Sequence, residues 1–129
     1  MSDTGIKRPR PKFLHLTQIR LPLPGVVSIL HRISGITLFL ALPFLLATFD
    51  QSLDSADGFA ACQANLAHPL VKLTLLALLA GYLYHFCAGI RFLLLDLNKG
   101  LDLATARFSS ALVIGVSLGL TLLAGVKLW

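Results

Sequence analysis

Polar side chains interrupt the long apolar stretches of this sequence at a few positions, and these are the candidates for chemistry. The first group is Ser28, His31 and Arg32. At about 100° per residue on a helix, Arg32 lies about 40° from Ser28 and His31 about 60° to its other side, so the three share one face. A hydroxyl beside a guanidinium can hold a carbonyl oxygen and stabilise negative charge that develops on it. Alternatively, Arg32 reaches lipid headgroups while Ser28 and His31 bond to backbone or to neighbouring helices.

The second group centres on His85, which has Gly81 four residues before it and Gly89 four residues after it. On a helix these positions form one stripe, so nothing bulky lies directly above or below the imidazole. A flat macrocycle such as haem can approach the helix there, with the imidazole as the axial ligand of its iron. The same small residues also suit close helix packing, with His85 bonded to a carbonyl of a partner helix. Spacing alone leaves both interpretations open.

The two groups complement each other if a haem lies between them. Arg91 marks the basic end of the stretch that contains His85. At about 1.5 Å per residue, His85 lies about 9 Å deeper in the membrane than Arg91. The propionates of a haem at that depth come within reach of His31 and Arg32. We expect His31 to lie too near the end of its own stretch to be a second ligand, so another subunit would have to supply one. Asp96 is expected to form an ion pair with Arg91.

The elements that carry these groups are predicted to span a membrane. The chain has 129 residues, of which 56% are hydrophobic and 13% charged, with a mean hydropathy of +0.80. Soluble domains contain about 25% charged residues, so the composition excludes a cytosolic globular enzyme. We expect an all-α integral membrane protein with three transmembrane helices, because three apolar stretches can each cross a hydrocarbon core of about 30 Å. These stretches lie at about 26–49, 69–95 and 106–128, within one domain at 26–129 that follows an N-terminal arm at 1–25.

Basic residues predict the orientation in the membrane. The N-terminal arm carries five Lys or Arg residues, and the connection at about 96–105 contains Lys99 between Arg91 and Arg107. The connection at about 50–68 contains three Asp and neither Lys nor Arg. We therefore expect a cytoplasmic N-terminus and a periplasmic C-terminus. The arm lacks the apolar run of a signal peptide, and we expect the membrane to be a bacterial inner membrane. The net charge of +5 lies at the ends of the apolar stretches, so we do not expect a nucleic-acid partner.

Two motifs carry a resemblance to a known family. They are S-x-x-H-R-x-S-G at residues 28–35 and H-x-x-x-G-I-R at residues 85–91. In this order and at this distance, they resemble the cytochrome b membrane-anchor subunit of bacterial succinate dehydrogenase (complex II, succinate:quinone oxidoreductase). The resemblance covers nearly the whole chain. Phe92 is a departure, because many members of the family have His after G-I-R.

The resemblance implies a hetero-oligomer whose anchor is a helical bundle shared with a second three-helix subunit. It also implies an iron–sulfur subunit and a flavoprotein on the cytoplasmic face, which deliver electrons from succinate to ubiquinone. By position, His85 matches the axial ligand of a haem b shared with the second anchor subunit. Ser28 and Arg32 match residues of the quinone site, and His31 and Arg32 match contacts to the haem propionates.

Two other functions are alternatives to this expectation. A purely structural membrane anchor of a respiratory complex would have the same three spans without haem or quinone chemistry. A small transporter is disfavoured, because no acidic residue lies in the middle of an expected span.

Overall fold

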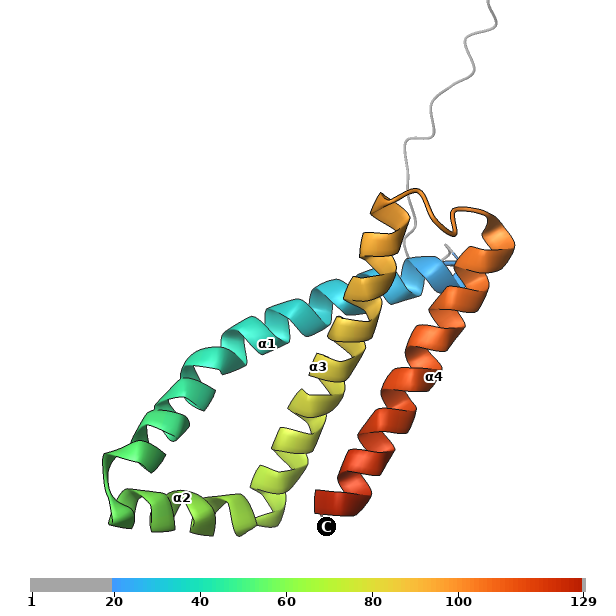
Figure 1. Cartoon of the computed structure of the whole chain (residues 1–129). Helices are drawn as coiled ribbons and strands as arrows, with labels where there is room; N and C mark the ends of the chain where they lie inside the picture. Colours follow the sequence, from blue (N-terminus) through green and yellow to red (C-terminus); the bar gives the residue numbers. More distant parts are fainter. Residues whose placement is uncertain (1–19, 129) are drawn as a thin grey trace, which may run out of the picture.

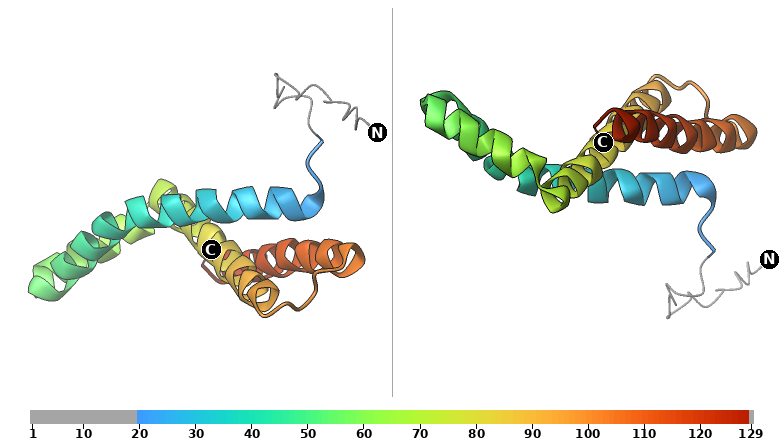
Figure 2. Two further views of the ribbon diagram at one scale, coloured as in Figure 1. Left: turned by 90° about the horizontal axis from the view of Figure 1, so that it is seen from above. Right: turned by 90° about the horizontal axis from the view of Figure 1, so that it is seen from below.

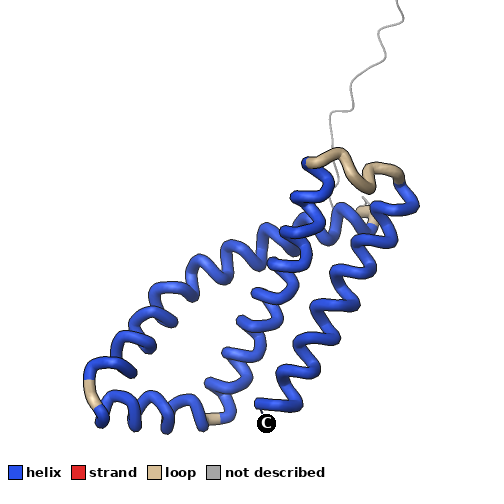
Figure 3. The backbone as a smooth tube through the Cα atoms, in the orientation of Figure 1, coloured by secondary structure: helices blue, strands red, loops and turns tan. Residues whose placement is uncertain are grey.

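The described part of the chain consists of four α-helices and contains no strand (Figures 1 and 3). The computed structural model describes residues 20–128, so most of the expected N-terminal arm lies outside the described residues. The helices are α1 (Leu23–Asp54), α2 (Ala56–Ala67), α3 (Pro69–Asp96) and α4 (Leu103–Leu128). Pro residues stand at the start of both α1 and α3, where the missing backbone N–H leaves no helical hydrogen bond unmade.

Three of these helices, α1, α3 and α4, are long and apolar enough to cross a membrane. This confirms the predicted all-α fold class with three transmembrane helices. Because α1 has 32 residues, it is about 48 Å long, well beyond the thickness of a hydrocarbon core of about 30 Å. A helix of that length fits by inclining to the membrane normal. Figure 1 shows α1 inclined to α3, and in both views of Figure 2 α3 crosses obliquely between α1 and α4.

The connection expected at about 50–68 is largely helical. α1 continues past the predicted end at residue 49 to Asp54, and the 12-residue helix α2 follows directly. Ser55 caps α2, because its Oγ accepts a hydrogen bond of 3.0 Å from the backbone N–H of Gly58. Figure 1 shows α2 lying across the ends of α1 and α3. α2 lacks the run of about 20 apolar residues that marks a membrane span, because it is short and its apolar residues are mostly Ala.

The small core lies where α1, α3 and α4 meet. Val27, Ala88 and Val113 contribute one buried side chain from each of the three helices. Tyr84 packs against this cluster, and its hydroxyl donates a hydrogen bond of 2.9 Å to the carbonyl of Val27 on α1. Small residues at the contact allow the helix backbones to approach closely, as is typical of helices in membranes. Most large apolar side chains instead remain exposed, as a lipid-facing or partner-facing surface requires.

Candidate functional site

The inclination of α1 brings His31 directly against His85 on α3. The two imidazole rings are stacked, with centroids 4.1 Å apart and planes 9° from parallel, and both side chains are half-buried. Gly35 makes this approach possible, because a Cβ atom at that position would stand only 2.9 Å from Cε1 of His85. The expectation that the two histidines lie at clearly different depths is wrong. Counting residues from the end of each helix ignores the angle at which α1 crosses α3.

The ring nitrogens of His85 are in different environments. Nδ1 lies 3.1 Å from the carbonyl oxygen of His31 and 3.1 Å from Oγ of Ser34. Because a carbonyl oxygen only accepts hydrogen bonds, this contact assigns the proton to Nδ1 and the lone pair to Nε2. Nε2 has no hydrogen-bond partner within the described residues and is not buried. This is the state of a metal-ligating histidine, in which one nitrogen donates to a carbonyl and the other offers its lone pair.

Nε2 of His31 is buried and has no hydrogen-bond partner. Among the described residues, it is the one buried side-chain nitrogen or oxygen atom of this kind. An unpaired buried polar group costs about 1–3 kcal/mol, so a group that binds it there is stabilised. The stacked rings present their faces to each other, so this pair does not hold one metal ion between its nitrogens. A single lone-pair nitrogen on His85 and an unpartnered nitrogen on His31 fit a haem, which needs an axial ligand and partners for its propionates.

The stripe of small residues around His85 is open at Gly81 but not at Gly89. A Cβ atom at Gly81 would meet nothing within 4 Å, and one at Gly89 would lie 3.7 Å from Nε2 of His31. Gly81 therefore faces open space, and Gly89 borders the unpartnered nitrogen. A flat group can therefore approach the helix at Gly81 without meeting a side chain, whereas at Gly89 it meets the ring of His31.

Ser28 and Arg32 lie toward the outer edge of α1. His31 and Ser28 are half-buried, whereas Arg32, farther around the helix from His31, is exposed. Neither the side chain of Ser28 nor that of Arg32 makes a hydrogen bond to another described residue. The fold thus joins His31 to His85 but leaves Ser28 and Arg32 on a surface that α3 and α4 do not enclose. A site that uses them has to be completed by another molecule.

Arg91 is not paired with Asp96, contrary to the expectation from sequence. Its side chain is 6% exposed and reaches α4, where Nε donates to Oγ of Ser109 at 2.9 Å and a terminal nitrogen donates to the carbonyl of Ala106 at 3.3 Å. The guanidinium also lies 5.4 Å from the ring centroid of Phe92. Residues 91–96 span more than one helical turn, so the partner of Arg91 is decided by the packing of α4. Sequence reasoning missed Ser109 because nothing in the spacing relates it to Arg91.

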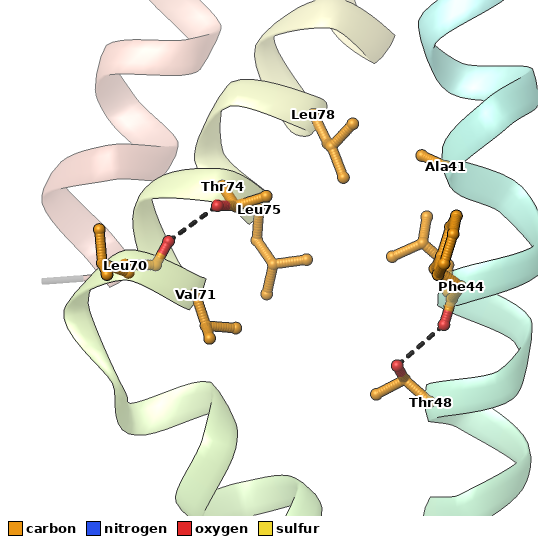
Figure 4. A pocket seen from close by; sticks show the side chains of 9 residues that line it. Ala41, Phe44, Thr48, Leu70, Val71, Thr74, Leu75 and Leu78 are labelled. Atoms are coloured by element: carbon orange, nitrogen blue, oxygen red, sulfur yellow. Dashed lines mark hydrogen bonds between the residues drawn. The ribbon is translucent and has the colours of Figure 1, made fainter.

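Two cavities adjoin α1 and α3. The first, of about 420 Å³, lies between α1 and α3 and is apolar (Figure 4). Its two hydroxyl groups, on Thr48 and Thr74, each donate back to a carbonyl of their own helix at 2.9 Å, so it offers no free donor. The second, of about 430 Å³, lies between α1, α3 and α4, and Ser34, Tyr84 and Ser117 are among its lining residues. This cavity borders the hydroxyl that contacts His85.

The fold and these contacts define an all-α membrane protein of several spans, with a stacked histidine pair where two spans cross. The family described as succinate dehydrogenase/fumarate reductase transmembrane subunit matches residues 6–124. The chain is 36% identical to the succinate dehydrogenase cytochrome b556 subunit of Coxiella burnetii over 93% of this chain and 97% of the relative. Subunits of the same description from Rickettsia felis and Paracoccus denitrificans are each 31% identical over 88% of this chain, covering 89% and 88% of their own lengths.

The chain therefore belongs to the family of transmembrane subunits of succinate dehydrogenase and fumarate reductase. The resemblance to its cytochrome b membrane-anchor subunits, expected from the two motifs, is confirmed.

Proposed function

We propose that this chain binds haem b through His85 and forms part of the site at which a succinate dehydrogenase reduces ubiquinone. The observation that carries the proposal is the bonding of His85, whose Nδ1 donates to the carbonyl of His31 and whose Nε2 is left open. The relatives are named cytochrome b556 subunits, which supports haem b as the group whose iron Nε2 would ligate.

Three side chains would hold the haem in this arrangement. Nε2 of His85 would ligate the iron, and His31, whose Nε2 has no partner, and Arg32 would contact the propionates. When bound, haem b supplies a one-electron redox centre. The stacked geometry leaves His31 unable to serve as the second axial ligand. We therefore propose that a second three-helix anchor subunit supplies that ligand.

Ser28 and Arg32 would bind the quinone at the outer edge of α1. Reduction of a quinone to a quinol takes up two electrons and two protons, and negative charge develops on its oxygens as the electrons arrive. The hydroxyl of Ser28 donates to one carbonyl oxygen, and the guanidinium of Arg32 stabilises the developing charge in a medium of low dielectric constant. An Arg keeps its charge there, whereas a Lys can lose its proton. The exposure of Arg32 supports a quinone site shared with partner subunits.

The proposed assembly contains, besides the second anchor, an iron–sulfur subunit and a flavoprotein. It would lie in a bacterial inner membrane with the N-terminus in the cytoplasm, as the basic residues predict. In that orientation Ser28 and Arg32, near the start of α1, lie on the cytoplasmic side. Protons for the quinone then come from the cytoplasm, and the quinone lies near the docked iron–sulfur subunit.

A reduced-minus-oxidised absorbance spectrum of the purified complex tests the haem. We expect a b-type band that is lost in His85→Ala and retained in His68→Ala. His68 is a suitable control because it caps α3 through Nδ1 and lies at the other end of that helix from Arg91. A complex without this band would instead support a purely structural anchor, and a band that survives His85→Ala would exclude His85 as the haem ligand.

A further inference from the structure

We propose that Ser34 is a positioning residue for His85, because its hydroxyl accepts a hydrogen bond from Nδ1 and holds the imidazole in the orientation that a haem ligand needs. This inference rests on the proposed haem-binding function. Sequence reasoning did not single out Ser34, because a serine in an apolar helix commonly bonds only to its own backbone. The structure places it against a titratable ring on another helix.

Three polar atoms meet at this point on the contact between α1 and α3. Ser34 Oγ lies 2.9 Å from the carbonyl oxygen of His31 and 3.1 Å from Nδ1 of His85, and that Nδ1 lies 3.1 Å from the same carbonyl. Ser34 is buried, with 9% of its surface exposed. Each atom of this triangle therefore has the other two as its neighbours.

Only one arrangement of protons satisfies all three contacts. The hydroxyl of Ser34 donates to the carbonyl of His31, and Nδ1–H of His85 is shared between that carbonyl and Oγ of Ser34. The opposite tautomer would direct the lone pair of Nδ1 at a carbonyl oxygen, which repels it. It would also place the proton on Nε2 and remove the lone pair that ligates iron. The carbonyl of His31 thus fixes the tautomer that can bind haem. The hydroxyl of Ser34, which donates to that carbonyl, accepts from the same Nδ1–H and adds a second contact that orients the ring.

A hydrogen bond to the distal nitrogen also makes an imidazole a stronger donor to the metal. A stronger donor stabilises the ferric state over the ferrous state, so losing this bond raises the midpoint potential of the haem. The carbonyl of His31 remains after Ser34 is replaced, so the ring loses one of its two acceptors and haem is still bound. We expect a change of about tenfold in the ferric–ferrous equilibrium, equivalent to about 59 mV for one electron.

The test is a redox titration of the haem band in the intact complex with Thr or Val at position 34. Ser34→Thr and Ser34→Val have nearly the same shape, but only Thr keeps a hydroxyl that can bond to the carbonyl three residues earlier. Ser34 lines the cavity of about 430 Å³, so the same open space borders both variants. We expect the potential to rise in Ser34→Val and to stay near the wild-type value in Ser34→Thr.

Ser117 provides a matched control for the loss of a buried hydroxyl. It is 3% exposed, lines the same cavity and donates to the carbonyl of Ile114 three residues earlier at 3.1 Å, but it contacts no imidazole. Ser117→Val should therefore leave the potential unchanged. If Ser34→Val prevents assembly, Ser34→Ala takes its place in the comparison, because it removes the hydroxyl without adding bulk.

The outcomes separate this inference from the proposed function. A wild-type complex without a haem band overturns both. A normal band whose potential is the same in wild type and Ser34→Val overturns only the role of Ser34. The role of Ser34 is also overturned if the potential shifts as much in Ser34→Thr or Ser117→Val as in Ser34→Val. The effect would then come from packing rather than from the hydroxyl.

Discussion

His31 contacts His85 twice, through its side chain and through its backbone. Its ring stacks on the ring of His85 at 4.1 Å, and its carbonyl oxygen accepts from Nδ1 of the same residue at 3.1 Å. One face and one edge of the His85 imidazole are thus held by a single residue of α1, while Nε2 stays open. The orientation of His85 consequently depends on how closely α1 approaches α3.

Gly35 controls that approach, and replacing it should displace His85. A Cβ atom at this position would lie 2.9 Å from Cε1 of the imidazole, and overpacking of this kind costs about 1–3 kcal/mol. We expect Gly35→Ala to weaken or abolish the haem band of the purified complex. Gly119→Ala is the control, since a Cβ atom at Gly119 meets nothing within 4 Å. A haem band of full intensity in Gly35→Ala would show that His85 does not need this close contact.

Arg32→Ala should separate two activities of the complex. We expect succinate:quinone activity to fall by about 10²-fold or more, the usual effect of removing one group that stabilises developing charge. Succinate oxidation by an artificial soluble acceptor should remain largely intact, because that reaction does not use the quinone site. Steady-state assays with the two acceptors measure this difference. An equal loss of both activities would mean that Arg32 serves assembly of the complex.

Arg91 should stabilise the contact between α3 and α4 through its two hydrogen bonds to α4. Hydrogen bonds from charged donors contribute about 1.5–3 kcal/mol each, and Arg91 donates to Ser109 and to the backbone of Ala106. We expect Arg91→Met to lower the temperature at which the complex loses its haem band, and Ser109→Ala to lower it less. In Arg91→Met, the further change Ser109→Ala should have little effect. Full additivity of the two changes would show that the two side chains do not act together.

The start of α4 should depend on pH through Asp102. Its carboxylate accepts a hydrogen bond of 2.9 Å from the backbone N–H of Thr105, and this bond, followed by that to the Thr105 side chain, lowers the pKa of Asp102. The stabilisation is therefore complete above the usual pKa of an aspartate and is lost as pH falls through the lowered value. Protection of the Thr105 amide from hydrogen exchange, measured against the intrinsic rate at each pH, should decrease over that acidic range.

Asp102→Asn is the matched variant for this prediction, because it keeps an oxygen acceptor that does not titrate. Its protection of the Thr105 amide should be independent of pH across the same range. If wild type and Asp102→Asn lose protection together, the acid sensitivity arises elsewhere in the chain.

The sequence alone was sufficient to predict the three membrane spans and the family. Apolar stretches of about 20 residues have few alternatives to a spanning helix, and their length alone identifies them. The spacing of Gly81, His85 and Gly89 predicted that they share one stripe, because positions on a single helix are related by a constant rotation. It did not predict that His31 lies against this stripe at Gly89. By contrast, α2 escaped prediction because a short helix of small residues has no such signature.

Only the tertiary structure decided which atoms meet across helices. The stack of His31 on His85, the triangle with Ser34 and the bonds from Arg91 to α4 all depend on the angle at which one helix crosses another. That angle arises from the summed packing of many small residues at the crossing point, and no local sequence pattern encodes it. The sequence determined which side chains share a face of each helix, and the crossing of α1 over α3 determined which of them touch.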